Sequence, residues 1–270
     1  MEVNHMPIPL VVKALLKRIL NDAQQKVLSD LYLRLYTSLH RNMKSLYLRF
    51  YTSLFRNNLT RLAIAFRTDK EGRHHYAKHY QRQFESLRRE KINLLEIGIG
   101  GYIDPRKGGE SLRMWKAYFP KSHIFGIDIY DKTCLDENRI KTFMGSQTDE
   151  DFLRRVAAEI GTIDIIIDDG SHQNNHVITS FGILFPLLSP KGIYVIEDLQ
   201  TSYWVEHGGS TDLLAPHTSM NFLKSLTDGL NYKEFRIDKY TPTYFDEHII
   251  SIHYYHNLVF IHKGKNKDSS

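Results

Sequence analysis

Four short apolar runs, separated by segments of helical periodicity, constrain the fold of this 270-residue chain more than any other feature. The runs read NLLEIG at 93–98, HIFGID at 123–128, IDIIID at 163–168 and GIYVIE at 192–197. Helix-like stretches fall between them at 109–118, 149–160 and 175–188. Strands that alternate with helices form a mostly parallel sheet with helices on both faces. The pattern therefore predicts an α/β fold of the open, Rossmann-like kind.

The segment 248–262, HIISIHYYHNLVFIH, departs from this alternation. It reads as two strands joined at about 256–257, which predicts an antiparallel hairpin at the end of the sheet. Parallel strands followed by such a hairpin are more typical of a methyltransferase than of a dehydrogenase. We expect the catalytic domain to occupy 61–265 and a flexible tail to occupy 266–270.

The N-terminal region, residues 1–60, is predicted to be a helical arm. It contains a near-repeat, because LYLRLYTSLHRN at 31–42 and LYLRFYTSLFRN at 46–57 agree at ten of twelve positions. We interpret the repeat as a packing or oligomerisation helix; a basic, aromatic helix on a membrane surface is the alternative. The arm has nine Lys or Arg and three Asp or Glu, a net charge of +6, so the other 210 residues sum to −1 and the excess in the total of +5 lies on the arm.

Charge and cysteine content exclude several classes of protein. A nucleic-acid enzyme would place its basic surface around the active site, whereas here the excess lies on the arm, so no nucleic acid is expected. Cys134 is the single cysteine, which excludes an internal disulfide and a cysteine-rich metal site. The chain has no apolar run that could span a bilayer and no leader pattern, so we expect a cytoplasmic protein.

A glycine-rich turn follows the first apolar run, with Gly98 and Gly100 in a position to approach a ligand closely. Asp128 ends the second run, where a carboxylate can accept hydrogen bonds from both ribose hydroxyls. The third glycine of a dinucleotide motif is replaced by Ile103, which favours a nucleoside cofactor without a pyrophosphate. The polar loop 145–149 could read an adenine edge, or it could simply cap the next helix.

Carboxylates gather at the ends of two later runs. Asp168 and Asp169 end one, and Glu197 and Asp198 end the next. Because parallel strands end at one edge of a sheet, these acids should lie close together and repel each other unless a cation neutralises them. A hard divalent ion, Mg²⁺ first, suits oxygen ligands. His172 follows closely and could accept the proton of a bound hydroxyl. Each residue alone could serve as a turn or helix cap.

Several segments together resemble the metal-dependent sugar O-methyltransferases of macrolide biosynthesis, the mycinamicin and demethylmacrocin 2''-O-methyltransferase type. The resemblance covers about three quarters of the chain, and the combination of IDDGSH with IEDLQTSYW is its most specific part. The matching segments are TDKEGRHHYAKHY (68–80), LLEIGIGGY (94–102), GGESLRMWKAYFP (108–120), GIDIYDK (126–132), IDDGSH (167–172), YVIEDLQTSYW (194–204) and YHNLVFIHKG (255–264).

The resemblance implies a class I fold, S-adenosylmethionine as methyl donor, Mg²⁺, a glycoside or glycan substrate and homo-oligomers. It implies metal ligands at Asp169, Glu197 and Asp198 and a catalytic base at His172, with Asp169 also beside the cofactor. The other cofactor contacts would fall around Thr68, Glu96, Gly98, Tyr102, Ser111, Asp128, Ser146 and Gln147.

The resulting hypothesis is a Mg²⁺-assisted O-methyltransferase acting on a sugar hydroxyl in natural-product biosynthesis. A catechol-type O-methyltransferase would use the same metal with an aromatic diol. A binding protein that keeps the fold without turnover, and a nucleic-acid methyltransferase, are the remaining alternatives. His75 and His79 in the segment 68–80 are four apart, which is half of a metal-ligand pattern, but no acid or cysteine joins them at ligand spacing. We therefore interpret this segment as a loop that orders over the cofactor.

Overall fold

The computed structural model describes residues 50–267 continuously, together with residues 30, 31, 34, 38, 43, 46 and 48. The chain divides into two compact units, residues 1–54 and 55–270, and the second contains the elements named below. Its helices are α3 (Leu59–Phe66), α4 (Ala77–Phe84), α5 (Glu110–Tyr118), α6 (Glu150–Ile160), α7 (Asn174–Leu184), α8 (Ser219–Gly229) and α9 (Tyr244–His248). Its strands are β1 (Asn93–Ile97), β2 (His123–Asp128), β3 (Ile140–Met144), β4 (Ile163–Asp168), β5 (Leu188–Ile196), β6 (Ile249–Tyr255) and β7 (Leu258–Lys263).

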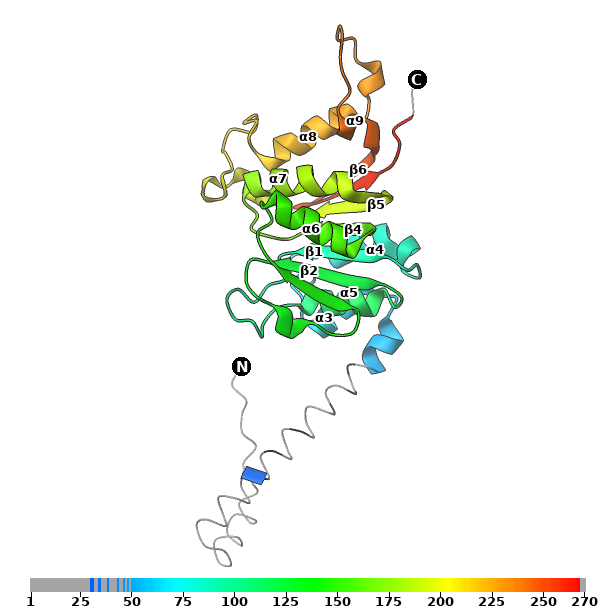
Figure 1. The fold of residues 1–270 in the computed structure, drawn as a ribbon, viewed down its shortest axis with the longest axis vertical. Helices are drawn as coiled ribbons and strands as arrows, with labels where there is room; N and C mark the ends of the chain where they lie inside the picture. Colours follow the sequence, from blue (N-terminus) through cyan, green and yellow to red (C-terminus); the bar gives the residue numbers. More distant parts are fainter. Residues whose placement is uncertain are drawn as a thin grey trace, which may run out of the picture. The chain divides into compact units, whose positions relative to one another are not determined.

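The strands form one seven-stranded sheet in the order β3-β2-β1-β4-β5-β7-β6 (Figure 1). The five strands β1 to β5 are parallel to one another, and β7 pairs antiparallel with both β5 and β6. The predicted fold and C-terminal hairpin are therefore confirmed. The chain order reverses beside β1, so the ends of β1, β2 and β4 form the crevice where ligands bind in open α/β sheets.

Alternate residues of each strand feed two separate cores. Leu94, Ile165 and Val195 pack beneath α3, α4 and α5, whereas Leu95 and Ile166 pack beneath α6, α7 and α8. Figure 1 shows these helices on opposite faces of the sheet. Burial on both faces explains why the parallel strands read as continuous apolar runs rather than as alternating patterns.

Three predicted boundaries differ from the structure: the end of the helix at 175–188, the start of the strand at 192–197 and the end of the helical arm at 60. Helix α7 ends at Leu184 and β5 begins at Leu188, because Pro186 falls in a short 3₁₀ turn between them. The helical arm does not continue through residue 60. The helix there ends before Arg56, and α3 starts afresh after Asn58, whose side chain accepts a hydrogen bond from the backbone N–H of Arg61 at 2.9 Å.

The N-terminal arm and the C-terminal tail lie partly outside the described residues. Most of the near-repeat at 31–49 is not described, and neither are 268–270. Within the expected tail, the side chain of Asn266 donates hydrogen bonds to the carbonyls of Leu230 and Asp246, so the chain is anchored at this residue. Among the described residues, no helix is both long enough and apolar enough to cross a membrane.

His262 on β7 makes the stability of the fold depend on pH. It lies 3.1 Å from the side-chain oxygen of Gln83 on α4, and burial, with a smaller contribution from His253, lowers its pKa to about 4. Between about pH 4 and the unfolded value of 6.5, the unfolded chain binds the proton more tightly, so acidification favours unfolding.

We expect His262→Gln to lose less stability than the wild type when the pH falls from 7 to 5. Urea unfolding at the two pH values measures this difference, because other titrating groups contribute equally to both proteins. Equal losses in the two proteins would mean that His262 titrates normally in the folded state.

Candidate active site

A segment that precedes the sheet, residues 68–80, crosses the ends of the strands; we call it the strap. Lys70 of the strap is fully buried, and its ammonium contacts three carboxylates. Its Nζ lies 3.1 Å from Glu96 Oε1, 2.9 Å from Asp169 Oδ2 and 2.6 Å from Glu197 Oε1. Burial alone would lower the pKa of Lys70, but Asp169, Glu197 and Glu96 outweigh it and raise the pKa above its usual range, so Lys70 is a cation.

Two tyrosines of the strap reach the same acids. The hydroxyl of Tyr76 donates to Asp198 Oδ1 at 2.8 Å, and the buried hydroxyl of Tyr80 donates to Glu197 Oε1. His74 Nδ1 lies 3.6 Å from Asp198 Oδ1. The strap therefore supplies one cation and two hydroxyl donors to the carboxylates, which lie between 26 and 127 residues away along the chain.

Backbone pairing brings the carboxylates together. β4 lies between β1 and β5, with Asp168 opposite Ile97 on one side and Ile196 on the other. The pairing continues past the strand ends, where Asp169 N–H donates to Ile97 O at 2.9 Å and Glu197 N–H donates to Asp168 O at 3.0 Å. This register fixes the acids that follow β4 and β5 at one edge of the sheet.

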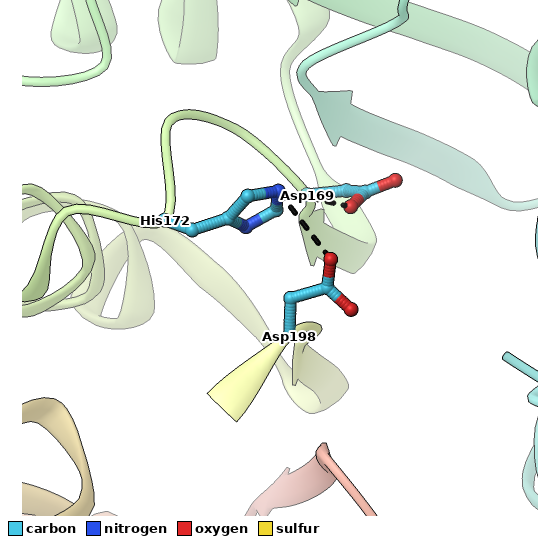
Figure 2. Close-up of side chains that lie close together, drawn as sticks. All are labelled: Asp169, His172 and Asp198. Carbon is cyan, nitrogen blue, oxygen red and sulfur yellow. Dashed lines mark ion pairs between the residues drawn. The ribbon is translucent and has the colours of Figure 1, made fainter. Parts of the chain in front are cut away.

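Asp169, His172 and Asp198 converge outside this buried cluster (Figure 2). His172 Nε2 lies 3.8 Å from Asp169 Oδ1 and 3.7 Å from Asp198 Oδ2. Each of the three residues offers one ligand atom within 4.8 Å of the others, and all three are partly accessible. Two carboxylates and an imidazole at this spacing fit a divalent metal.

The structure groups the predicted metal ligands in two ways. Asp169 and Asp198 share the accessible cluster with His172, whereas Glu197 groups with Asp169 and Glu96 around Lys70. Asp169 belongs to both groups. The sequence also counts Asp168 among the acids, but its buried carboxylate accepts hydrogen bonds from Ser180 and Gln147, and burial raises its pKa to about 6. Asp168 is thus part of the core.

A cavity of about 230 Å³ lies beside the strand-end acids. Its lining includes four of the predicted cofactor residues, Thr68, Gly98, Ser111 and Asp169, along with Arg67, Asp69, Ile99, Gly100 and Glu110. Glu96 lies behind it and accepts a hydrogen bond from the Ser111 hydroxyl at 2.7 Å. Asp169 therefore lies between the cavity and His172.

The remaining predicted cofactor residues have partners within the protein. Asp128 accepts hydrogen bonds from the backbone N–H groups of Ile99 and Tyr130, so it anchors the glycine turn. Gln147 is buried, accepts from the Ser171 N–H at 2.8 Å and donates to Asp168. In the loop 145–149, the Asp149 side chain caps α6. This agrees with the prediction that the loop caps the next helix.

Ser146 and Tyr102 occupy the edges of this region. The Ser146 hydroxyl lies 2.9 Å from that of Thr148, and Tyr102 is 85% exposed. The loop that carries Tyr102 is anchored by Lys132, whose buried ammonium donates to the carbonyls of Tyr102, Asp104 and Lys107 at 2.6, 2.7 and 3.2 Å.

Lys70, Tyr76 and Tyr80 contact the acids but are not among the predicted site residues. All three lie in the segment TDKEGRHHYAKHY, which the resemblance marks and the sequence predicts only as a loop near the cofactor. A lysine 26 positions or more from its carboxylate partners gives no signal in a single sequence, because sheet topology alone brings them together.

Comparison with known proteins relates this geometry to characterised enzymes. The chain is 46% identical over 214 residues, 78% of its length, to the mycinamicin VI 2''-O-methyltransferase of Micromonospora griseorubida. It is 44% identical over 216 residues, 79% of its length, to the 8-demethyl-8-(2-methoxy-alpha-L-rhamnosyl)-tetracenomycin-C 3'-O-methyltransferase of Streptomyces olivaceus. Over the matched residues the chain is a homologue of the macrolide-type sugar O-methyltransferases.

A solved structure agrees with this assignment. The methyltransferase MycE from the mycinamycin pathway, in complex with Mg, SAH and mycinamycin VI, superposes with a TM-score of 0.75 at 46% identity. The match covers 78% of this chain and 54% of MycE. The chain spans about half the length of the curated relatives it matches, 54% and 55% of the two named above. No family model matches the chain.

Proposed function

We propose that this chain is an S-adenosylmethionine-dependent, Mg²⁺-assisted O-methyltransferase that acts on a sugar hydroxyl of a small-molecule glycoside. One observation carries the proposal: Asp169 both lines the 230 Å³ cavity and belongs to the accessible cluster with His172 and Asp198. A methyl donor in the cavity and a hydroxyl held at the cluster would therefore be neighbours. The names of the relatives, which methylate sugars of macrolides and tetracenomycins, support the sugar as acceptor.

In this proposal the cavity binds the donor. Ser111, Gly98 and Thr68 line the wall next to Glu96, and the accessible oxygens of Asp169 and Asp198 would hold Mg²⁺. Glu197 is predicted to assist them from the buried side. When bound, the ion would lower the pKa of an acceptor hydroxyl and orient it.

His172 is the proposed general base. Its Nε2 would take the hydroxyl proton while the oxygen forms a bond to the methyl carbon and the bond from that carbon to sulfur breaks. The products would be the methyl ether, S-adenosylhomocysteine and a protonated imidazole. Asp169 and Asp198 face the same nitrogen at 3.8 and 3.7 Å, so they would stabilise its positive charge.

The test is methyl transfer to a purified panel of rhamnosyl and related glycosides, with catechols and RNA as competing acceptors, followed by mass spectrometry. We expect methylated glycoside with Mg²⁺, loss of product in EDTA and recovery when Mg²⁺ is added back. Full activity in chelator would remove the ion from the mechanism. Methylation of catechols alone would support the aromatic-diol alternative, and donor binding without turnover on any acceptor would support a binding protein.

Residues 61–265 are the proposed methyltransferase domain, and residues 1–60 are proposed to mediate homo-oligomer formation in a cytoplasmic enzyme. Support comes from apolar side chains of the arm that are more than half exposed. These are Leu31, Met43, Leu46, Phe50 and Leu54. Light scattering on the full chain would detect the oligomer, and a monomer would contradict this assembly.

A further inference from the structure

The carboxylates at the strand ends form two cation positions that share Asp169. Glu96, Asp169 and Glu197 surround the inner position, and Asp169, His172 and Asp198 surround the outer one. The inner position already contains a cation, because Lys70 Nζ lies within 3.1 Å of an oxygen from each of its three acids. Among the described residues, only the outer position lacks a side-chain cation of Lys or Arg.

Lys70 contacts one oxygen of Asp169, the carboxylate that both positions share, and one oxygen of Glu197. It contacts Asp169 through Oδ2, while Oδ1 of Asp169 faces His172 at 3.8 Å. It contacts Glu197 through Oε1, which also accepts from Tyr80. Asp169 Oδ2 is thus engaged by Lys70, while Asp169 Oδ1 lies on the side of the outer position.

The three inner acids repel one another, and the ammonium of Lys70 lies among them. Glu96 and Glu197 are at most 3% exposed, and Asp169 is 19% exposed at the side chain, so water screens their mutual repulsion poorly. Buried carboxylates without a counter-ion either take up protons or separate. Lys70 is the ammonium that contacts all three of these acids, so it offsets their repulsion.

Lys70 is held at both its backbone and its ammonium. The acids contact the ammonium, and the strap holds the backbone. The backbone carbonyl of Lys70 accepts hydrogen bonds from the N–H groups of Tyr76 and Ala77 at 2.9 and 3.0 Å, where α4 begins. The side chain is fully buried along its length. Lys70 is therefore a fixed part of the site and does not exchange with solvent cations.

We propose that Lys70 is a permanent internal cation that holds Asp169 and Glu197 in the orientation needed for metal binding, and so is a positioning residue for the reaction. The inference rests on the proposed function for the identity of the outer ligand. Its structural part, that Lys70 neutralises the acids and keeps them assembled before any ligand binds, stands independently.

The first experiment replaces Lys70 by Ala and restores the missing group with n-propylammonium chloride. Isothermal calorimetry with S-adenosylhomocysteine and Mn²⁺ titration by electron paramagnetic resonance measure the two sites without turnover. We expect Lys70→Ala to weaken both affinities by at least about tenfold, since charged hydrogen bonds are lost. Propylammonium should restore them, whereas tetramethylammonium, which has no N–H group, should not.

Lys263→Ala is the matched control. Lys263 is also buried, and its ammonium donates to the carbonyls of Phe185, Pro186 and Leu188 at the opposite end of the sheet. Its loss should leave both affinities within about twofold of the wild type, because distant sites act independently. Unchanged affinities in a folded Lys70→Ala protein would overturn the inference. A wild type that binds neither ligand would instead overturn the proposed function.

If Lys70→Ala does not fold, a second pair of variants tests whether Lys70 neutralises the acids. Thermal unfolding compares Lys70→Met with the double variant Lys70→Met/Glu197→Gln, which also removes a carboxylate charge. If Lys70 neutralises Glu197, the double variant should have the higher Tm. If Lys70 only fills space, the second substitution should lower the Tm further, and the inference would be wrong.

Discussion

Replacing His172 by Gln is expected to lower kcat for methyl transfer by about 10²–10⁴-fold, the usual contribution of a general base. The amide of Gln has similar polarity but cannot accept a proton at neutral pH. The affinity for S-adenosylhomocysteine should change little, because the cavity is lined by other residues and His172 faces Asp169 and Asp198 from outside it. Steady-state kinetics and calorimetry on the same protein measure the two quantities.

His176→Gln is the control for this substitution. His176 lies one turn away on α7, is partly exposed and contacts Ser171 rather than the carboxylates, with Nδ1 2.8 Å from the serine hydroxyl. Its replacement should leave kcat within about threefold of the wild type, as expected for a partly exposed residue that does not contact the carboxylates. Equal effects of the two substitutions, or a large loss of donor affinity in His172→Gln, would argue against a base at this position.

Replacing Gly98 by Ala is expected to remove donor binding and to destabilise the fold by about 2–5 kcal/mol, from positive-φ strain and overpacking together. Gly98 has φ +79°, and an added Cβ would lie 2.1 Å from the carbonyl oxygen of Asp169. The contact is between two backbones, so no side chain can rotate to relieve it. Either the glycine turn or the Asp169 turn must move, and both border the cavity.

Gly161→Ala is the control that separates backbone strain at positive φ from steric overlap of the added Cβ. Gly161 has φ +81°, but an added Cβ there would meet nothing within 4 Å. It should therefore cost only the conformational penalty of a non-glycine residue at φ +81° and ψ −121°, about 1–3 kcal/mol, and leave donor binding intact. Thermal unfolding and calorimetry on both variants provide the comparison. If Gly98→Ala behaves like Gly161→Ala, the turn is more adaptable than its close approach to Asp169 indicates.

Much of the fold could be predicted from the sequence because burial on both faces leaves an unambiguous apolar run. β1, β2, β4 and β5 all show such runs. β3, with the sequence IKTFM, is the exception. It lies at the edge of the sheet, pairs only with β2 and exposes Lys141 and Met144, so its apolar residues do not form a run.

The site was less predictable than the fold. Acids at strand ends could be predicted because parallel strands all end at one edge of the sheet. The structure does bring Asp169 and Asp198 together at this edge. The same reasoning does not separate Asp168, which points into the core, from Asp169, which points out, since adjacent residues differ only in the face they occupy. It also does not find Lys70, whose partners are fixed by the path of the strap across the sheet.

Because Lys132 anchors the Tyr102 loop, the conformational entropy of that loop is lost during folding and not during ligand binding. Three carbonyls converge on one buried ammonium, so the loop has a defined course in the ligand-free protein. The backbone entropy of these residues is therefore given up as the polypeptide folds, and association with a small molecule does not have to order them again. The rim beside the glycine turn is in this sense preorganised.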